Sequence, residues 1–272
     1  MSTIVFVHAH PDDEASSTGG SMARAAAEGH RVVLVVCTDG DLGEAPEDLA
    51  DGETVVARRR KETAASTAIL GVGRTVWLGY RDSGMTGWEQ NEDPASFWQA
   101  DLDEAGERLA AVLREEQADA VVLYDWHGGY GHPDHVQVHR VGHRAADLAG
   151  TPRRFESTYN RDAMKRRLAD APVPAPAAEG EPGGDFDFDP DGPADDGNPF
   201  GTPESEIDLR VDVSAYLDQK RRALASHASQ TTDVGAMIAM PPEVFGAFFG
   251  TEWFIVPGDE HHLHDGWLLD PT

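Results

Sequence analysis

Two short stretches of the chain place histidine, proline and aspartate in the same order. The first is His10-Pro11-Asp12-Asp13-Glu14 and the second is Gly131-His132-Pro133-Asp134-His135. Imidazole nitrogens and carboxylate oxygens are ligands of zinc and of iron(II). Each stretch comes soon after an apolar run that indicates a buried strand. The pair therefore predicts that two strand ends meet and hold one divalent metal ion.

His10, Asp13 and His135 are the predicted metal ligands. Two imidazoles and one carboxylate leave a coordination position open for water, as a catalytic zinc site requires. Iron(II) fits the same set, so the ligand types leave the choice between Zn²⁺ and Fe²⁺ open. Pro11 stiffens the turn that lets His10 and Asp13 approach one ion. An ion held there would lower the pKa of a bound water and polarise a carbonyl group.

A metal site of this kind could hydrolyse a carbonyl compound, and three neighbouring residues suit the other roles that hydrolysis needs. Asp12 stands beside a ligand and is the candidate general base. His132 could donate to a developing oxyanion or protonate a leaving group. Asp134 could orient His132 or a ligand histidine by a hydrogen bond, without binding the metal itself. His139, one helical turn after His135, is expected on a helix face or behind the ligands.

The elements that must position these residues alternate between strand and helix. Strands are predicted at 3–8, 31–37, 74–78, 119–124 and 153–158, and helices at 20–28, 53–70, within 95–117, at 133–149 and at 160–170. This alternation predicts an α/β fold, a three-layer Rossmann-like sandwich with a mostly parallel sheet. The order 3-2-1-4-5 makes the first and fourth strands neighbours, with a crevice at their carboxyl ends. The glycine-rich dinucleotide fingerprint is absent after the first strand.

The rest of the chain is expected to complete one domain spanning residues 1–272. Residues 172–203 are rich in proline, glycine and aspartate and predict a flexible acidic insertion. Residues 206–256 contain a strand-like alternation, a helix and an aromatic stretch that should return to the core. The histidine-rich run 261–264 is expected to be a surface tail.

The composition limits the partners of the protein. The formal net charge is −27 and the chain has only three lysines, which argues against nucleic acid and anionic membranes. Cys37 is the only cysteine, so an internal disulfide and a cysteine-rich zinc site are excluded. No signal peptide or spanning segment is evident, so the expected location is cytoplasmic and no membrane insertion is expected. The sequence leaves the oligomeric state open, including a homo-oligomer.

The two motifs together resemble the LmbE-like family. This is the N-acetylglucosaminyl-phosphatidylinositol de-N-acetylase (PIG-L) family, which includes the mycothiol-pathway deacetylase and mycothiol S-conjugate amidase. The resemblance covers residues 3–160 well and is weaker over 206–256, where His227-Ala228-Ser229-Gln230 is similar to a recurring family element. It implies zinc-dependent hydrolysis of an N-acyl group, usually N-acetyl, from a small-molecule aminosugar.

The resemblance also implies roles for individual residues. It makes His10, Asp13 and His135 the metal ligands and Asp12 the general base. His132 would assist the tetrahedral intermediate, and Tyr130 would help to polarise the acyl carbonyl.

For the substrate, the resemblance implies that Asp82 contacts sugar hydroxyls and that Arg59 grips an inositol group. The alternative for Arg59 is that residues 58–60 form a solvated helix face. The segment 172–203 departs from the mycothiol branch, which leaves the aglycone side of the substrate open.

Three other functions compete with this interpretation. A non-catalytic metal- or sugar-binding module would lack the base, yet Asp12 is present. A metal-dependent phosphoesterase would favour basic phosphate grips and a second carboxylate cluster. Within the family, a mycothiol S-conjugate amidase and a deacetylase of a natural-product aminosugar remain alternatives.

Overall fold

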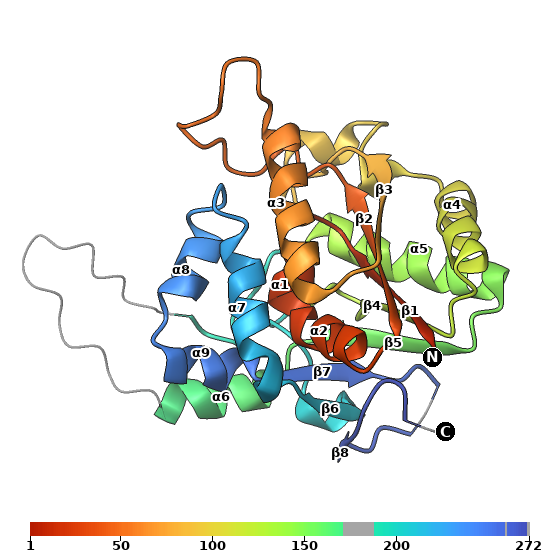
Figure 1. Cartoon of the computed structure of the whole chain (residues 1–272), viewed down its shortest axis with the longest axis vertical. Coiled ribbons are helices and arrows are strands. Elements are labelled where there is room, and N and C mark those ends of the chain that lie inside the picture. The colour runs from red at the N-terminus through yellow and green to blue at the C-terminus, as the bar shows by residue number, and fades with distance from the viewer. Residues whose placement is uncertain (171–187, 259, 271–272) are drawn as a thin grey trace, which may run out of the picture.

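The computed structural model describes residues 1–170, 188–258 and 260–270 (Figure 1). The strands are β1 (Thr3–His8), β2 (Arg31–Thr38), β3 (Arg74–Tyr80), β4 (Ala120–Tyr124), β5 (Arg153–Thr158), β6 (Leu209–Asp212), β7 (Thr251–Ile255) and β8 (His264–Asp265). The α-helices are α1 (Asp13–Ser17), α2 (Gly19–Ala27), α3 (Val55–Leu70), α4 (Leu102–Glu115), α5 (Pro133–Ala149), α6 (Arg161–Asp170), α7 (Leu217–Ala225), α8 (Asp233–Ala239) and α9 (Pro242–Phe249). Short 3₁₀ turns occur at Glu89–Glu92, Phe97–Gln99, Glu204–Glu206 and Ser214–Tyr216.

These strands form one sheet in the order β3-β2-β1-β4-β5-β7-β6-β8. The first five are parallel, and their order confirms the arrangement 3-2-1-4-5 predicted from the sequence. Because β1 and β4 are direct neighbours, the loops that follow them lie at the same edge of the sheet. That edge carries both His-Pro-Asp motifs.

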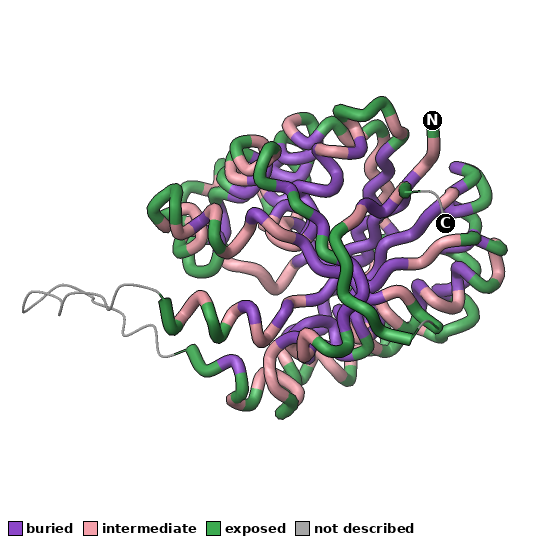
Figure 2. The backbone as a smooth tube through the Cα atoms, turned by 90° about the horizontal axis from the view of Figure 1, so that it is seen from below, coloured by how far each residue is buried: buried purple, intermediate pink, exposed green. Residues whose placement is uncertain are grey.

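The core lies on both faces of the sheet, as side-chain alternation along a strand requires. Ile4 and Phe6 of β1 pack with residues of α2 and α7, whereas Val5 and Val7 pack with residues of α4 and α5. The helices therefore form two outer layers around the sheet (Figure 1), and most residues of the central strands are buried (Figure 2). This confirms the predicted three-layer α/β sandwich.

The C-terminal part extends the sheet in a way that the sequence did not predict. β7 runs antiparallel between β5 and β6. Glu252 on β7 accepts the backbone N–H groups of Gly20 and Ser21, both at 2.9 Å, and the Lys220 ammonium at 2.6 Å. This buried carboxylate thus joins the end of the chain to the start of α2.

The acidic insertion expected at 172–203 lies partly outside the described residues, which resume at 188. Residues 188–203 form turns and isolated bridges without a helix or strand of their own. They pack on the loop after β4: Gly201 N–H donates to Gly129 O at 2.6 Å, and Asp195 N–H donates to Tyr130 O at 2.9 Å. No helix in the described ranges is long and apolar enough to cross a membrane.

Candidate metal centre and active site

The loop after β1 folds back so that His10 and Asp13 face each other. The backbone N–H of His10 donates to Asp13 Oδ2 at 2.8 Å, and the same oxygen lies 3.4 Å from His10 Nδ1. Asp12 stands between them in the left-handed conformation, with φ of 97°, and is the N-cap position of α1.

The loop after β4 presents His132 and His135 from the first turn of α5. Gly128 has φ of 66°, and a Cβ there would collide with the side chain of His135, so glycine is required. His132 is the N-cap residue: its Nδ1 accepts the N–H of Asp134 at 3.1 Å. Pro133 occupies the first helical turn, where its missing N–H costs nothing.

Hydrogen bonds leave one free lone pair on each candidate histidine ligand. His135 Nδ1 lies 3.1 Å from the carbonyl oxygen of Gly128, so that nitrogen carries the proton and Nε2 is left as the acceptor. In the neutral ring of His10, Nε2–H donates to Asp134 Oδ2 at 3.0 Å and Nδ1 is the acceptor. Burial opposes the shift, but Asp82, Asp13 and Asp134 raise the pKa of His10 well above its usual value, so a metal ion would replace the proton on Nδ1. Metal-bound histidines commonly donate their second N–H to a carbonyl or carboxylate in this way.

Two of the three distances among these free atoms suit a metal ion. Asp13 Oδ2 lies 3.4 Å from both His10 Nδ1 and His135 Nε2. Two bonds of about 2.0–2.1 Å at a tetrahedral angle hold their ligand atoms about 3.3 Å apart. His135 Nε2 is also buried without a hydrogen-bond partner among the described residues. A buried nitrogen rarely stays unpaired, so the residues present fit a cation here.

Two overlapping groups of converging ligand atoms lie at this edge, and neither contains Asp13. His10, His132 and His135 offer ligand atoms within 4.8 Å of one another, and so do His10, Asp82, His132 and Asp134. Asp82 Oδ1 lies 3.6 Å from His10 Nε2, on the opposite side of that ring from the nitrogen that faces Asp13. Candidate metal ligands are therefore closely spaced at this edge of the sheet, and His10 belongs to each group of them here.

A second cluster lies on the far side of β4 and contains His139. His139 Nδ1 is 3.1 Å from Tyr124 O, and His143 Nε2 is 2.7 Å from Glu156 Oε1. His139, His143 and Glu156 also offer converging ligand atoms. The nitrogens that face Tyr124 and Glu156 are already hydrogen-bonded, in contrast to His135 Nε2. His139 is thus separate from the candidate ligands of the first cluster.

The run 261–264 is largely exposed, as expected, although His264 begins β8.

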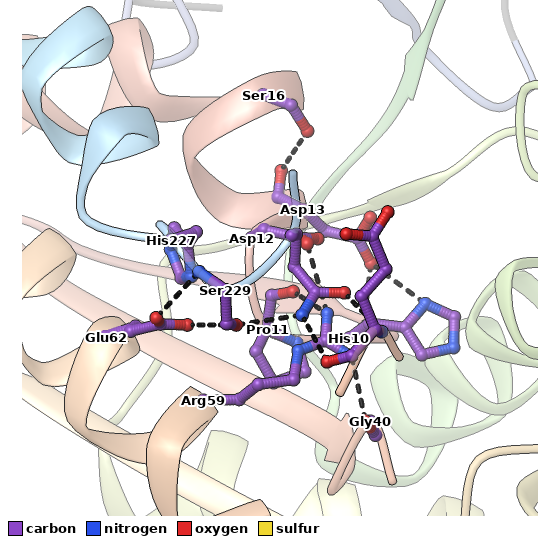
Figure 3. Close-up of polar contacts among 12 residues, drawn as sticks. His10, Pro11, Asp12, Asp13, Ser16, Gly40, Arg59, Glu62, His227 and Ser229 are labelled. Atoms are coloured by element: carbon purple, nitrogen blue, oxygen red, sulfur yellow. Dashed lines mark hydrogen bonds and ion pairs between the residues drawn. The ribbon is translucent and has the colours of Figure 1, made fainter. Parts of the chain in front are cut away.

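Asp12 is held beside the candidate metal position by Arg59. Arg59 Nη2 donates to Asp12 Oδ2 at 3.0 Å (Figure 3). Burial raises the pKa of Asp12 to about 6, although Arg59 opposes the shift. A carboxylate with a raised pKa accepts a proton more readily than an ordinary one, which suits a general base.

His132 and Tyr130 are hydrogen-bond donors at the same edge. Burial, with His10 and His135 nearby, lowers the pKa of His132 well below its usual value, so the ring is neutral. Because Nδ1 of His132 accepts a backbone N–H, its proton sits on Nε2. Burial raises the pKa of Tyr130 well above its usual value, so the phenol keeps its proton. Its ring lies edge-on to His135, with centroids 4.9 Å apart.

The two predicted substrate residues are both buried. Arg59 is only 4% exposed, and its terminal nitrogens also donate to Gly40 O at 2.8 Å and Pro11 O at 2.6 Å. Asp82 is 7% exposed and accepts the N–H of Gly84 at 2.9 Å. The solvated face considered for Arg59 is therefore wrong, and contact of either residue with a substrate stays a prediction.

Sequence reasoning missed several residues that shape this edge. The N–H and hydroxyl of Ser83 both donate to the fully buried Asp134. Phe200 stacks near Tyr130, with centroids 6.4 Å apart, and Asp196 lies 3.3 Å from His127. Ser83 could have been found, because it follows the third parallel strand at the same edge. Phe200 and Asp196 come from the acidic insertion, where no periodicity marks an inward-facing side chain.

Comparison with known sequences identifies the family. The PIG-L profile, described as GlcNAc-PI de-N-acetylase, matches residues 5–146. The chain belongs to this family. It is 42% identical over 267 residues to the 1D-myo-inositol 2-acetamido-2-deoxy-alpha-D-glucopyranoside deacetylase of Thermobifida fusca (strain YX), covering 92% of this chain and 91% of that protein. The family resemblance predicted from the two motifs is confirmed.

Solved structures share the fold across nearly the whole chain. The N,N'-diacetylchitobiose deacetylase of Pyrococcus horikoshii has a TM-score of 0.59 at 21% identity, covering 93% of this chain and 83% of that one. GalB, a 4-carboxy-2-hydroxymuconate hydratase from Pseudomonas putida KT2440, has a TM-score of 0.55 at 18% identity, covering 95% and 97%. Since one fold serves a deacetylase and a hydratase, function must be argued from the site.

Proposed function

We propose that this protein is a zinc-dependent de-N-acetylase that removes the acetyl group from a glucosamine-containing small molecule. The observation that carries the proposal is the arrangement at the sheet edge. Two histidines each commit one nitrogen to a protein acceptor and turn the other toward Asp13, while Asp12 stands beside them as a base. The sequence similarity to a deacetylase of an N-acetylglucosaminyl inositol supports this substrate class.

His10 Nδ1, Asp13 Oδ2 and His135 Nε2 would hold the metal. Zn²⁺ suits two imidazoles and one carboxylate, and Fe²⁺ is the alternative occupant. An ion bound there would lower the pKa of water toward neutrality and polarise the acyl carbonyl. Asp134 keeps the His10 ring in the tautomer that the ligand set needs.

The residues of this chain perform the proton transfers. Asp12 accepts the proton of the attacking water as the oxygen bonds to the amide carbon. The Nε2–H of His132 and the O–H of Tyr130 donate to the oxyanion that develops on the carbonyl. As the C–N bond breaks, a proton passes from Asp12, or from His132, to the leaving amine, and acetate and the free amine remain. Several donors and one base around one carbonyl suit amide hydrolysis.

A substrate panel tests the proposal. Acetate release would be measured with N-acetylglucosaminyl inositol and other N-acetylglucosamine glycosides, and release of the free glucosaminyl amine with a mycothiol S-conjugate, each with zinc or iron(II). Phosphate release from phosphomonoesters would be measured in parallel. We expect acetate release from the inositol glycoside to be fastest. Faster cleavage of the S-conjugate would identify an amidase instead, and phosphate release without acetate release would contradict the proposal.

A further inference from the structure

Asp12 adopts a backbone conformation that its residue type does not favour. Its φ is 97°, and Gln117 is the only other non-glycine residue with positive φ among the described residues. Such a conformation costs free energy and persists only where surrounding contacts impose it. The contacts that hold Asp12 therefore determine where the proposed base stands.

The backbone of Asp12 is held by Glu14. Asp12 N–H donates to Glu14 Oε2 at 3.0 Å. The other oxygen of Glu14 accepts the hydroxyl of Ser66 at 2.6 Å and Nε2–H of His227 at 2.7 Å. Glu14, Ser66 and His227 are all fully buried. Ser66 and His227 thus hold one oxygen of the Glu14 carboxylate, while the other oxygen accepts the N–H of Asp12.

His227 comes from the far end of the chain, in the element His227-Ala228-Ser229-Gln230. This element is fastened to α3, because the N–H and hydroxyl of Ser229 donate to Glu62 at 2.9 Å and 2.6 Å (Figure 3). Residues 59, 62 and 66 share one face of α3, as the spacing i, i+3, i+7 requires. That face holds the side chain of Asp12 through Arg59 and the element 227–230 through Glu62.

Stability alone gives a poor reason to keep the His227–Glu14 pair. Burying two ionisable groups carries a large desolvation cost, and well-packed apolar residues often stabilise a core as well. A buried pair of this kind specifies one geometry, and the geometry it reaches here is the turn at Asp12.

We propose that His227 is a positioning residue for the base, and that it acts through Glu14 to fix the left-handed turn at Asp12. The inference rests on the proposed function in that Asp12 is taken as the base. It assigns a role to the His-Ala-Ser-Gln element, which contacts none of the candidate metal ligands through a described hydrogen bond. The element then connects the C-terminal part of the chain to the chemistry at the N-terminal motif.

The test compares His227→Ala, His227→Gln and His227→Asn with the wild type. The matched control is His143→Ala, which removes a histidine at the same 2.7 Å distance from another buried glutamate. Each protein is assayed for bound zinc, for kcat and KM, and for hydrogen exchange of a peptide covering residues 9–16. Exchange reports local opening at Asp12 without depending on activity.

We expect His227→Ala to keep its zinc and its KM and to lose about 10–100-fold in kcat, as for other residues that orient a site from behind. The Asp12 peptide should exchange faster. His227→Gln should recover much of both losses, because its amide N–H can reach Glu14 where the shorter Asn cannot. His143→Ala should leave both unchanged.

Three results would overturn the proposal: unchanged kcat and exchange in His227→Ala, equal behaviour of the Gln and Asn variants, or an equal loss in His143→Ala. If His227→Ala does not fold, Ser66→Ala removes one hydroxyl from the same carboxylate and should show smaller changes of the same kind; no change would overturn the proposal. If the wild type releases no acetate, the proposed function fails, and the exchange data alone decide whether His227 fixes the turn.

Discussion

The same tripeptide, His-Pro-Asp, occurs after β1 and after β4 with two different structures. After β4 the helix begins early: His132 is the N-cap residue, and Asp134 lies inside α5 and is fully buried. After β1 the helix begins two positions later: Asp12 is the N-cap position, and its side chain is partly exposed beside Arg59. The aspartate that precedes its helix is thus partly exposed, whereas the aspartate inside its helix is buried.

This difference gives the two motifs complementary roles. The first motif supplies a candidate ligand, His10, and a partly exposed base, Asp12. The second motif supplies the inward-facing Asp134, which lies 3.0 Å from His10 Nε2, and His132, whose Nε2–H is free to donate. The buried aspartate of one motif therefore orients the histidine of the other. Residue order alone does not set a role; the local backbone does.

Removing a ligand that follows the second motif should have the largest effect. His135→Ala removes the Nε2 atom that faces Asp13, so the metal and the activity should both be lost. Elemental analysis and acetate release measure the two. Unchanged metal content in a folded His135→Ala protein would remove His135 from the ligand set.

Asp12→Asn should separate the base from the ligands. We expect turnover to fall by about 10²–10⁴-fold, because the amide cannot accept the proton of water. Zinc content should stay at the wild-type value, since Asp12 faces Arg59. Zinc loss would place Asp12 among the ligands, and near wild-type turnover would show that another group is the base.

The two functions of His132 can be separated by two substitutions. Asparagine can still accept the N–H of Asp134 as an N-cap residue, whereas alanine cannot and should cost about 1 kcal/mol of stability. Both should lose the donor to the oxyanion and about 10²–10³-fold in kcat. Thermal unfolding and kinetics of His132→Asn and His132→Ala check this. Full activity of His132→Asn would exclude the donor role.

Asp134→Asn should have the smallest effect of the four. The amide leaves His10 without a charged acceptor, so we expect zinc affinity or activity to fall by about 10–100-fold. Competition with a chelator measures the affinity. Ser83→Ala is the matched control, because it removes one hydrogen bond to Asp134 and leaves the carboxylate in place. An effect of Ser83→Ala as large as that of Asp134→Asn would show that burial, and not the contact with His10, is what matters.

The sequence predicted the parallel strands, their order and the meeting of the two motifs, because each follows from hydrophobic runs and sheet topology. It could not distinguish whether Asp134 serves His132 or His10, since that choice depends on how the loops after β1 and β4 pack together. It also missed the contact between Glu14 and His227, which are 213 residues apart. The antiparallel β7 was missed as well, because a buried apolar run carries no signal of strand direction.

Anomalous X-ray scattering from the zinc-loaded protein would test the division of roles most directly. We predict one zinc peak bounded by His10 Nδ1, Asp13 Oδ2 and His135 Nε2, with Asp12 and Asp134 outside its coordination sphere. A peak among Asp82, His132 and Asp134, on the other side of the His10 ring, would contradict it.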